Sequence, residues 1–368
     1  MKKLKVLILD YDPILWVSLL ILSLLGLLGV YSATYKGGTS PLFFKQLIYL
    51  LVGWFVIALL SRFNFRVLLD MAPGIYLFNL FLLTLVPIVG KTVYGAKRWL
   101  DLGPVSLQPS ELMKFSLLLF LVYTFSHARR LWSKEVFVGL FSLTVPFFLT
   151  LKQPDLGTAL TFILIFAVVL FLWGLKVLYF ILAGISLLAS APLLWHLLKD
   201  YQKERILAVI DPYSDYQGSG YQLIQSVIAV GSGGMFGKGF LQGTQSHLLF
   251  LPEKHTDFIF SVISEEWGLM GSFILVSVFF LIFYGVLKYS LLSTDHAERL
   301  FLGALGTLWI FQVSVNFLMT MGLMPVVGMP LPFVSYGGSA ILTFSLLLGT
   351  ALSIIREQRN RSIRFEHG

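Results

Sequence analysis

The sequence predicts an all-α protein that spans a membrane about ten times. Hydrophobic residues make up 57% of the chain and charged residues only 12%, whereas soluble domains carry about 25% charged residues. The mean hydropathy is +0.83. Apolar runs of about 20 residues recur along the chain, which is the length of a transmembrane helix, and the alternating ten-residue segments of a β-barrel are not seen. One transmembrane domain over residues 1–368 is therefore expected.

The first five predicted helices follow one another closely. The first run is too long for a signal peptide and lacks a small-residue cleavage site, so we expect it to stay in the protein. A polar outer segment, residues 90–108, precedes the fourth helix, which starts near Pro109 because proline suits a first helical turn. The five runs cover about 14–31, 43–60, 67–89, 109–129 and 136–151.

The second half of the chain is divided by a large loop, about residues 198–256, between the seventh and eighth helices. The remaining runs cover about 156–173, 177–197, 257–287, 300–321 and 336–355, and a basic tail, about 356–368, follows. The eighth run is long enough to contain a tilted or broken helix. An even number of spans places both termini on the same side.

Lysine and arginine residues orient the bundle, because cytoplasmic loops carry an excess of them. They gather at the termini and in the even-numbered loops, for example Lys2, Lys3, Arg129 and Arg130; the short odd-numbered loops hold only Lys36, Lys91, Lys97, Arg98 and Lys152. We therefore expect cytoplasmic termini and an extracytoplasmic large loop. The net charge of +8 then reflects topology and contact with membrane lipids, not nucleic acid. Cysteine is absent, which excludes disulfides and thiol chemistry.

The stretch 248–268 carries acidic residues from a polar loop into the predicted eighth helix. Glu265 and Glu266 fall where an acidic side chain costs about 2.5–3.5 kcal/mol at the centre of a membrane. We expect both to be structural polar groups with buried partners. Asp257 lies at the junction, where a carboxylate can stay hydrated and face a substrate, although spacing alone favours a helix N-cap. Ser261 would follow one turn below Asp257 in a regular helix.

Other ionisable residues gather at the predicted outer ends of helices. Glu111 and Lys114 lie on one face of the fourth helix; they form either a self-satisfied ion pair or a site where Lys114 meets a phosphate in a cavity. Asp155 is either a functional group or the N-cap of the sixth helix. Arg98 lies in a basic outer segment that suits an anionic head group or interfacial anchoring.

Two loops are rich in glycine. The run 231–239, which contains Lys238, permits close approach of a ligand to the backbone, but it matches neither a dinucleotide fingerprint nor a P-loop. The last outer loop, residues 324–339, is uncharged and rich in proline and glycine, which indicates a rigid or re-entrant cover. His255 is a single imidazole and makes a poor metal site.

Together these motifs resemble the SEDS family (shape, elongation, division and sporulation) over nearly the whole chain. The resemblance is carried by residues 98–99, 108–114, 153–158, 220–239, 251–268 and 325–339. The runs 243–246 and 323–328 look more like the elongation branch, the RodA proteins, than the division branch, the FtsW proteins.

The resemblance implies a peptidoglycan glycosyltransferase that polymerises lipid II into glycan strands during cell elongation. The reaction would take place at the outer face of the cytoplasmic (inner) membrane of a bacterium. Asp257 is then the family's essential aspartate, and the Glu111 and Lys114 pair matches a functionally important motif. A class B penicillin-binding protein, a transpeptidase, is the expected partner, alongside lipid II and the growing glycan strand.

The implied chemistry assigns further roles. A sugar hydroxyl attacks the anomeric carbon of another lipid II and displaces polyprenyl diphosphate with inversion, so Asp257 is predicted to be the general base or the ligand of a divalent cation, Mg²⁺ or Mn²⁺. An ordinary aspartate pKa of about 3.9 makes a weak base, so proton transfer would be late. The predicted substrate-binding residues, which include the candidates for holding the leaving diphosphate, are Lys114, Glu111, Arg98, Arg205, Asp155 and Lys238.

Two other functions stay open at this level. A flippase for lipid II would suit the intramembrane Glu111, Lys114, Glu265 and Glu266, but the polar motifs gather on the outer face, whereas transporter sites lie near the midplane. A scaffold that only recruits the transpeptidase would not need Asp257 together with the outer cations.

Overall fold

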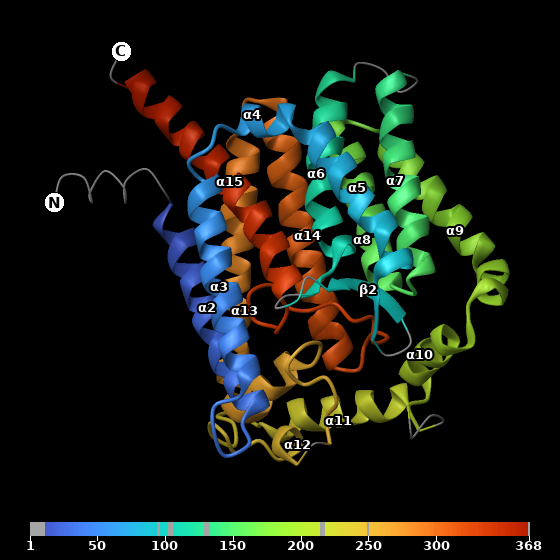
Figure 1. Ribbon diagram of the computed structural model, residues 1–368, viewed down its shortest axis with the longest axis vertical. Helices are drawn as coiled ribbons and strands as arrows, with labels where there is room; N and C mark the ends of the chain where they lie inside the picture. Colours follow the sequence, from blue (N-terminus) through green and yellow to red (C-terminus); the bar gives the residue numbers. More distant parts are fainter. Residues whose placement is uncertain are drawn as a thin grey trace.

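The computed structural model describes residues 12–93, 96–101, 103, 106–128, 133–213, 218–248 and 250–366. Long helices run along the molecule, and short helices close one end (Figure 1). In the described part of the chain, nine helices are long and apolar enough to cross a membrane. Lys2, Lys3, Arg129 and Arg130, which served to orient the bundle, lie outside the described residues.

The observed helices match the predicted spans closely. The nine are α2 (Pro13–Thr34), α3 (Pro41–Leu60), α5 (Ala72–Val89), α7 (Lys134–Lys152), α8 (Leu156–Trp173), α9 (Val177–Leu197), α13 (Ile259–Leu292), α14 (His296–Thr320) and α15 (Gly338–Glu366). The remaining predicted span, the fourth, is α6 (Pro109–His127), which is less apolar because Glu111 and Lys114 lie in its first turns. The third predicted span is divided at Met71 into α4 (Phe65–Asp70) and α5.

The polar segments between the spans also have regular structure. The predicted outer segment 90–108 contains three antiparallel strands, β1 (Lys91–Val93), β2 (Ala96–Asp101) and β3 (Ser106–Leu107). The large loop holds α10 (Asp200–Ile210), α11 (Ser219–Ser232) and α12 (Thr244–His247). These three short helices lie at the end of the bundle opposite to the start of α2 and the end of α15 (Figure 1). The two ends of the described bundle are therefore on one side, as an even number of spans requires.

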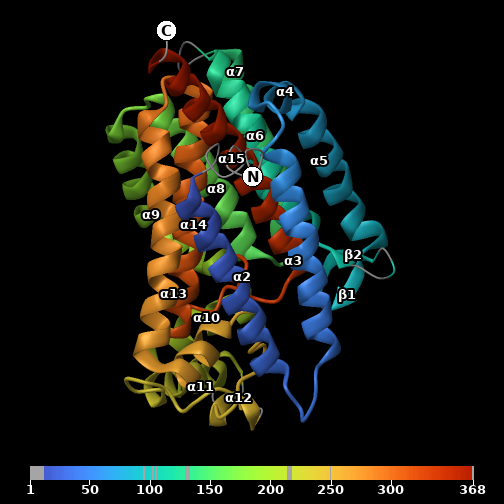
Figure 2. The same ribbon diagram turned by 90° about the vertical axis from the view of Figure 1, so that its left-hand side faces the viewer.

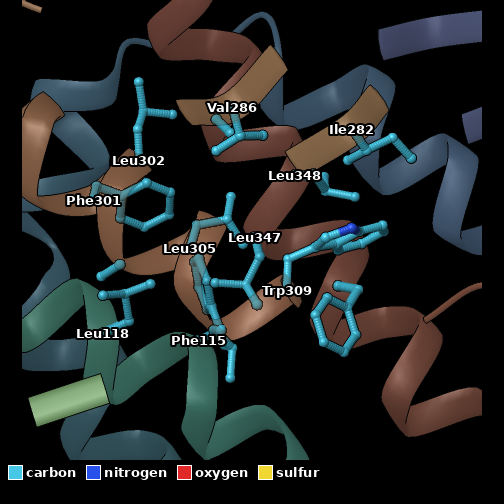
Figure 3. Close-up of a cluster of buried hydrophobic side chains, with 14 of the residues drawn as sticks. Phe115, Leu118, Ile282, Val286, Phe301, Leu302, Leu305, Trp309, Leu347 and Leu348 are labelled. Carbon is cyan, nitrogen blue, oxygen red and sulfur yellow. The ribbon is translucent and has the colours of Figure 1, made fainter. Parts of the chain in front are cut away.

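The centre of the bundle is formed by α6, α14 and α15, with α13 against them. Side chains from all four helices interlock in one hydrophobic cluster (Figure 3). Trp309 of α14 lies fully buried in this cluster, and its indole donates a hydrogen bond to the Phe279 carbonyl at 3.2 Å. Polar side chains on these central helices are consequently shielded from both lipid and water, so each needs a partner inside the protein.

Of the two alternatives for the eighth helix, tilted or broken, the structure shows a break. Gly268 interrupts α13 with φ 66° and ψ −159°, a conformation open to glycine alone. Residues 233–239 of the glycine-rich run fill the break: Lys238 N donates to the Glu265 carbonyl at 3.0 Å, and Leu269 N donates to the Gly234 carbonyl at 2.9 Å. These bonds satisfy backbone groups that the break would otherwise leave unpaired.

The glycine-rich run therefore has a different role from the predicted one. A Cβ atom on Gly237 would lie 2.1 Å from the Glu266 carbonyl oxygen, and one on Gly233 would lie 2.0 Å from the Ser264 carbonyl oxygen. Glycine is needed at these two positions because the loop backbone packs directly on the backbone of α13. At Gly233 and Gly237 the close approach that was expected for a ligand is made by this helix.

Candidate active site

Asp257 lies in a turn, residues 251–258, that leads into α13. The helix begins at Ile259, its N-cap is Phe258, and no side chain caps it, so the N-cap interpretation of Asp257 was wrong. For the same reason Ser261 does not continue a polar stripe from Asp257. Asp257 is partly exposed, and its Oδ2 lies 3.6 Å from the position that a Cβ on Gly328 would take. The carboxylate thus faces the last outer loop.

The surroundings of Asp257 change its acidity. Burial is the main cause that raises its pKa, and the negative charges of Glu253 and Asp155 raise it further, whereas Arg205 and Arg98 act in the opposite direction. The result is a pKa of about 7. This value lies above the ordinary aspartate pKa of about 3.9 that the sequence suggested. A pKa near the working pH suits a general base.

Two amide side chains on α14 position the turn and the loop. Asn316 Nδ2 donates to the Asp257 carbonyl at 2.9 Å and to the Met329 carbonyl at 2.7 Å. One helical turn earlier, Gln312 Nε2 donates to the Pro330 carbonyl at 2.8 Å. Both side chains are fully buried. They fix the last outer loop over Asp257, which agrees with its prediction as a rigid cover.

The Glu111 and Lys114 pair is buried inside the bundle. Lys114 is 1% exposed, and its Nζ lies 2.6 Å from Glu111 Oε1 and 3.3 Å from Gln312 Oε1. The prediction that Lys114 faces a cavity and meets a phosphate does not agree with this arrangement, because the neighbouring helices enclose α6. The pair instead reaches the site indirectly, since Gln312 bonds the loop that covers Asp257.

Arg98 and Asp155 organise the connection between α7 and α8. Arg98 Nε donates to the Gln153 carbonyl at 2.9 Å, and Nη2 donates to the Pro154 carbonyl at 2.5 Å. Asp155 is the N-cap of α8, because its Oδ1 accepts the Thr158 N–H at 3.1 Å. The N-cap alternative for Asp155 is confirmed. Both residues still act on Asp257 through their charges.

Arg205 is the exposed cation of the site. It projects from α10, and its Nη1 donates to the Val326 carbonyl at 3.0 Å. The guanidinium carbon lies 5.9 Å from the centre of the Tyr201 ring, which is within the range of a cation–π contact. Arg205 therefore combines exposure to a substrate with a charge that acts on Asp257.

The remaining predicted site residues have protein partners. Lys238 Nζ lies 2.7 Å from Glu265 Oε1, and the buried Glu265 also accepts the Gln245 N–H at 2.9 Å. Glu266 accepts a hydrogen bond from the Ser32 hydroxyl. Ser261 and Ser226 share a hydrogen bond of 2.7 Å. These residues tie α13 to the large loop and to α2, and Lys238 belongs to this structural group.

The structure thus brings Asp257, Asp155, Arg98 and Arg205 into one electrostatic neighbourhood and adds Glu253 to it. Within the described ranges, no group of three or more His, Cys, Asp or Glu side chains could hold a metal ion. Sequence reasoning missed Gln312 and Asn316, because they carry no charge. Their only signal was a pair of amides one turn apart on an otherwise apolar helix.

The sequence is similar to a known protein family and to curated members of it. Residues 12–360 match the model of the FtsW, RodA and SpoVE family, described as cell cycle proteins. The chain is 38% identical over 345 residues to the peptidoglycan glycosyltransferase MrdB of Escherichia coli, covering 93% of each chain. It is 35% identical over 357 residues to a probable peptidoglycan glycosyltransferase FtsW of Geobacter sulfurreducens, covering 94% of this chain and 95% of the relative.

Solved structures of similar proteins share the fold of this chain. A chain of a peptidoglycan synthase complex, studied for the coordination of polymerization and crosslinking, superimposes with a TM-score of 0.81 at 34% identity, covering 95% of this chain and 98% of that chain. The rod shape determining protein RodA of Thermus thermophilus superimposes with a TM-score of 0.71 at 30% identity, covering 95% and 97%.

Proposed function

The chain belongs to the FtsW, RodA and SpoVE family, the SEDS proteins, and is a peptidoglycan glycosyltransferase of a bacterial membrane; from this premise we propose that it polymerises lipid II with Asp257 as the general base. The observation that carries the proposal is the combination of a partly exposed carboxylate, a pKa of about 7 and two neighbouring guanidinium groups. The reaction takes place at the outer face of the cytoplasmic membrane.

The proposed step transfers one proton and exchanges one bond at carbon. The 4-hydroxyl oxygen of the acceptor saccharide attacks the anomeric carbon of the donor while Asp257 takes the hydroxyl proton. The bond from that carbon to the diphosphate oxygen breaks, the diphosphate leaves with the electron pair, and the configuration inverts. Because Asp257 is partly exposed, it returns the proton to solvent. A pKa of about 7 leaves enough unprotonated carboxylate at neutral pH to begin each cycle.

The leaving diphosphate is assigned to Arg205 and Arg98. Arg205 is exposed, and Arg98 bonds only neutral carbonyl groups through the contacts described above, so neither positive charge is cancelled there. Lys114 was the first candidate for this role from the sequence. We now place it behind the arginines, because its ammonium is enclosed and paired with Glu111.

A divalent cation, Mg²⁺ or Mn²⁺, is a further proposed component. Its binding to Asp257 would replace the general-base role of that carboxylate: the donor set fits an ion held by Asp257 together with substrate phosphates, because Mg²⁺ commonly uses only one or two carboxylates and completes its shell with phosphate and water. The charges of Glu253 and Asp155 favour a cation there. When bound, the ion would supply positive charge to the leaving diphosphate.

The biological setting is proposed from the relatives. Similarity to E. coli MrdB and to T. thermophilus RodA favours a role in cell elongation. Similarity to a chain of a complex that coordinates polymerization and crosslinking favours a transpeptidase of the class B penicillin-binding proteins as partner. The flippase alternative loses its main support, because the intramembrane charges Glu111, Lys114, Glu265 and Glu266 all have protein partners.

The test is lipid II polymerisation by the purified protein with its partner transpeptidase and Mg²⁺. Asp257→Asn should lower the rate at least about 100-fold, the size of a general-base contribution, while lipid II still binds and the melting temperature is unchanged. Ser335→Ala removes the bonds that the Ser335 hydroxyl makes to Leu331 N and to the Thr256 carbonyl, and so it shows how far the melting temperature falls when a packing contact of this region is lost. Polymerisation by Asp257→Asn at the wild-type rate would exclude the proposed role.

A further inference from the structure

A cavity of about 620 Å³ opens beside the turn that carries Asp257. One wall is the connection between α2 and α3, including Lys36 and Ser40, and the other is residues 251–255. This connection and the large-loop helices α11 and α12 lie at the same end of the molecule (Figure 2). The volume falls within the range of about 300–1,000 Å³ that is typical of small-molecule sites. Arg98, Arg205 and Asp257 do not line the cavity.

The walls of the cavity carry more positive than negative charge. Lys36 and Lys254 both line it, and Glu253 is the acidic residue among the lining side chains. Burial and the charge of Lys36 hold the pKa of Lys254 below its usual range. The two ammonium groups therefore repel each other, and an anion between them would relieve that repulsion. Lys254 donates to the Ser246 carbonyl, which leaves further N–H donors on the ammonium for a ligand.

The start of α3 adds to this positive potential. Ser40, Pro41 and Leu42 all line the cavity, and Ser40 is the N-cap that accepts the Leu42 N–H at 3.2 Å. The positive end of the α3 dipole therefore lies at the cavity wall, where it favours an anionic ligand. The cavity combines this helix end with two lysines in one concave site.

The cavity is connected to Asp257 through Glu253. Glu253 lines the cavity, and its charge is also the largest electrostatic contribution that raises the pKa of Asp257 after burial. The same short turn thus presents Glu253 to Asp257 and Lys254 to the cavity. A ligand held by Lys36 and Lys254 would lie beside the turn that carries Asp257, whereas Arg98 and Arg205 act on Asp257 without lining the cavity.

We propose that this cavity binds the diphosphate-saccharide head group of the acceptor, while Arg98 and Arg205 hold the diphosphate that leaves the donor. The proposal rests on the proposed function, because only a polymerase needs two lipid-linked saccharides at once. The acceptor diphosphate stays intact, so the cavity binds and orients and takes no part in bond breaking. Lys36 and Lys254 therefore contribute to the affinity for the acceptor and not to the affinity for the donor.

The test separates the two substrates chemically. A 4-deoxy lipid II has no attacking hydroxyl and serves only as donor; a lipid II with a methylene group in place of the leaving oxygen serves only as acceptor. In a single coupling between them, the double variant Lys36→Ala, Lys254→Ala should raise the KM for the acceptor about tenfold, as expected for loss of charge-assisted hydrogen bonds. The KM for the donor and kcat should stay unchanged.

Two further variants keep the test independent of folding. Thr39→Trp places bulk in the exposed wall without removing a charge, and it should raise the same KM. Lys97→Ala removes an exposed outer lysine of β2 and should change neither KM.

Several outcomes overturn the proposal. They are a rise in the KM for the donor, no change in either KM, or loss of binding to phosphatidylglycerol vesicles with the acceptor KM intact, which would make the cavity a phospholipid site. Coupling that persists in Asp257→Asn would instead contradict the proposed function.

Discussion

Glu265 and Asp257 lie close together in the sequence but are held in opposite ways. Glu265 is fully buried, and its carboxylate accepts bonds from Lys238 and from the Gln245 backbone. Asp257 is partly exposed. Asn316 donates a hydrogen bond to the backbone carbonyl of Asp257 and not to its carboxylate. The comparison shows that an acidic residue inside the membrane is not catalytic merely because its position is energetically unfavourable. The carboxylate that is left available for a proton is the better candidate.

The largest effect that separates the two residues should be on stability. Glu265→Ala removes the anchor of the large loop and leaves Lys238 and backbone N–H groups without their acceptor, so the free energy of unfolding should fall by about 3 kcal/mol. Asp257→Ala should change it by less than about 1 kcal/mol, because no cap or ion pair is lost. Thermal unfolding of both variants in the same detergent measures the difference.

The control for this comparison is Glu265→Gln, which keeps the shape and an acceptor oxygen and should lose less stability than the alanine variant. Equal destabilisation by Asp257→Ala and Glu265→Ala would show that Asp257 is also an anchor. The distinction between a structural Glu265 and a catalytic Asp257 would then not be supported by their stabilities.

The next effect concerns the side chain that holds the Asp257 backbone. Asn316→Leu keeps the branched shape of the side chain but leaves the Asp257 and Met329 carbonyls without a donor, at a cost of about 1–3 kcal/mol for a buried unsatisfied group. If this cost destabilises the arrangement of the Asp257 turn that the reaction needs, kcat should decrease by roughly 30-fold, with little change in the KM for lipid II. Steady-state kinetics separates the two parameters.

Thr320→Val is the matched control, because Thr320 lies one turn further along α14 and its hydroxyl bonds only carbonyl groups of the same helix. It should leave kcat close to the wild-type value. A normal kcat in Asn316→Leu would show that the turn keeps its geometry without the amide.

Much of this architecture could be predicted from the sequence, because hydropathy and caps are local properties. The spans 156–173 and 177–197 coincide with α8 and α9, and the length of the eighth run indicated a tilted or broken helix. The short strands were missed, since only their pairing defines them.

The site was less predictable, because the partner of a polar side chain depends on the tertiary structure. Spacing could not decide whether Lys114 meets a phosphate or Glu111, and the packing around α6 decides it. The targets of Arg98 are backbone carbonyls, which leave no mark in the sequence. Gly233 and Gly237 belong to a run that was recognised as a site of close approach, but the group that approaches them is a helix backbone.

A smaller effect should appear in the dependence of the rate on pH. A general base works in its unprotonated form, so a pKa of about 7 for Asp257 predicts that kcat rises through pH 7 and falls about tenfold for each pH unit well below it. Glu253→Gln removes a charge that raises this pKa, so the rising limb should move to lower pH. His255 has a pKa below its usual range, mainly through burial, and should not produce this limb.

The measurement is kcat between about pH 5.5 and 8.5 for the wild type and Glu253→Gln. If kcat rises over the same pH range in both proteins, the group that titrates is not an Asp257 whose pKa is raised by Glu253.

The smallest effect tests Asp155, which belongs to both sides of the comparison. Its carboxylate caps α8, as an anchor does, and its charge also raises the pKa of Asp257. Asp155→Ala should lower the free energy of unfolding by about 1 kcal/mol, whereas Asp155→Asn keeps the cap and should lower it much less. Both substitutions remove the negative charge, so both should move the rising limb of the pH profile slightly to lower pH. If only the alanine variant moves it, the shift arises from fraying of α8, and the charge of Asp155 has no effect on Asp257.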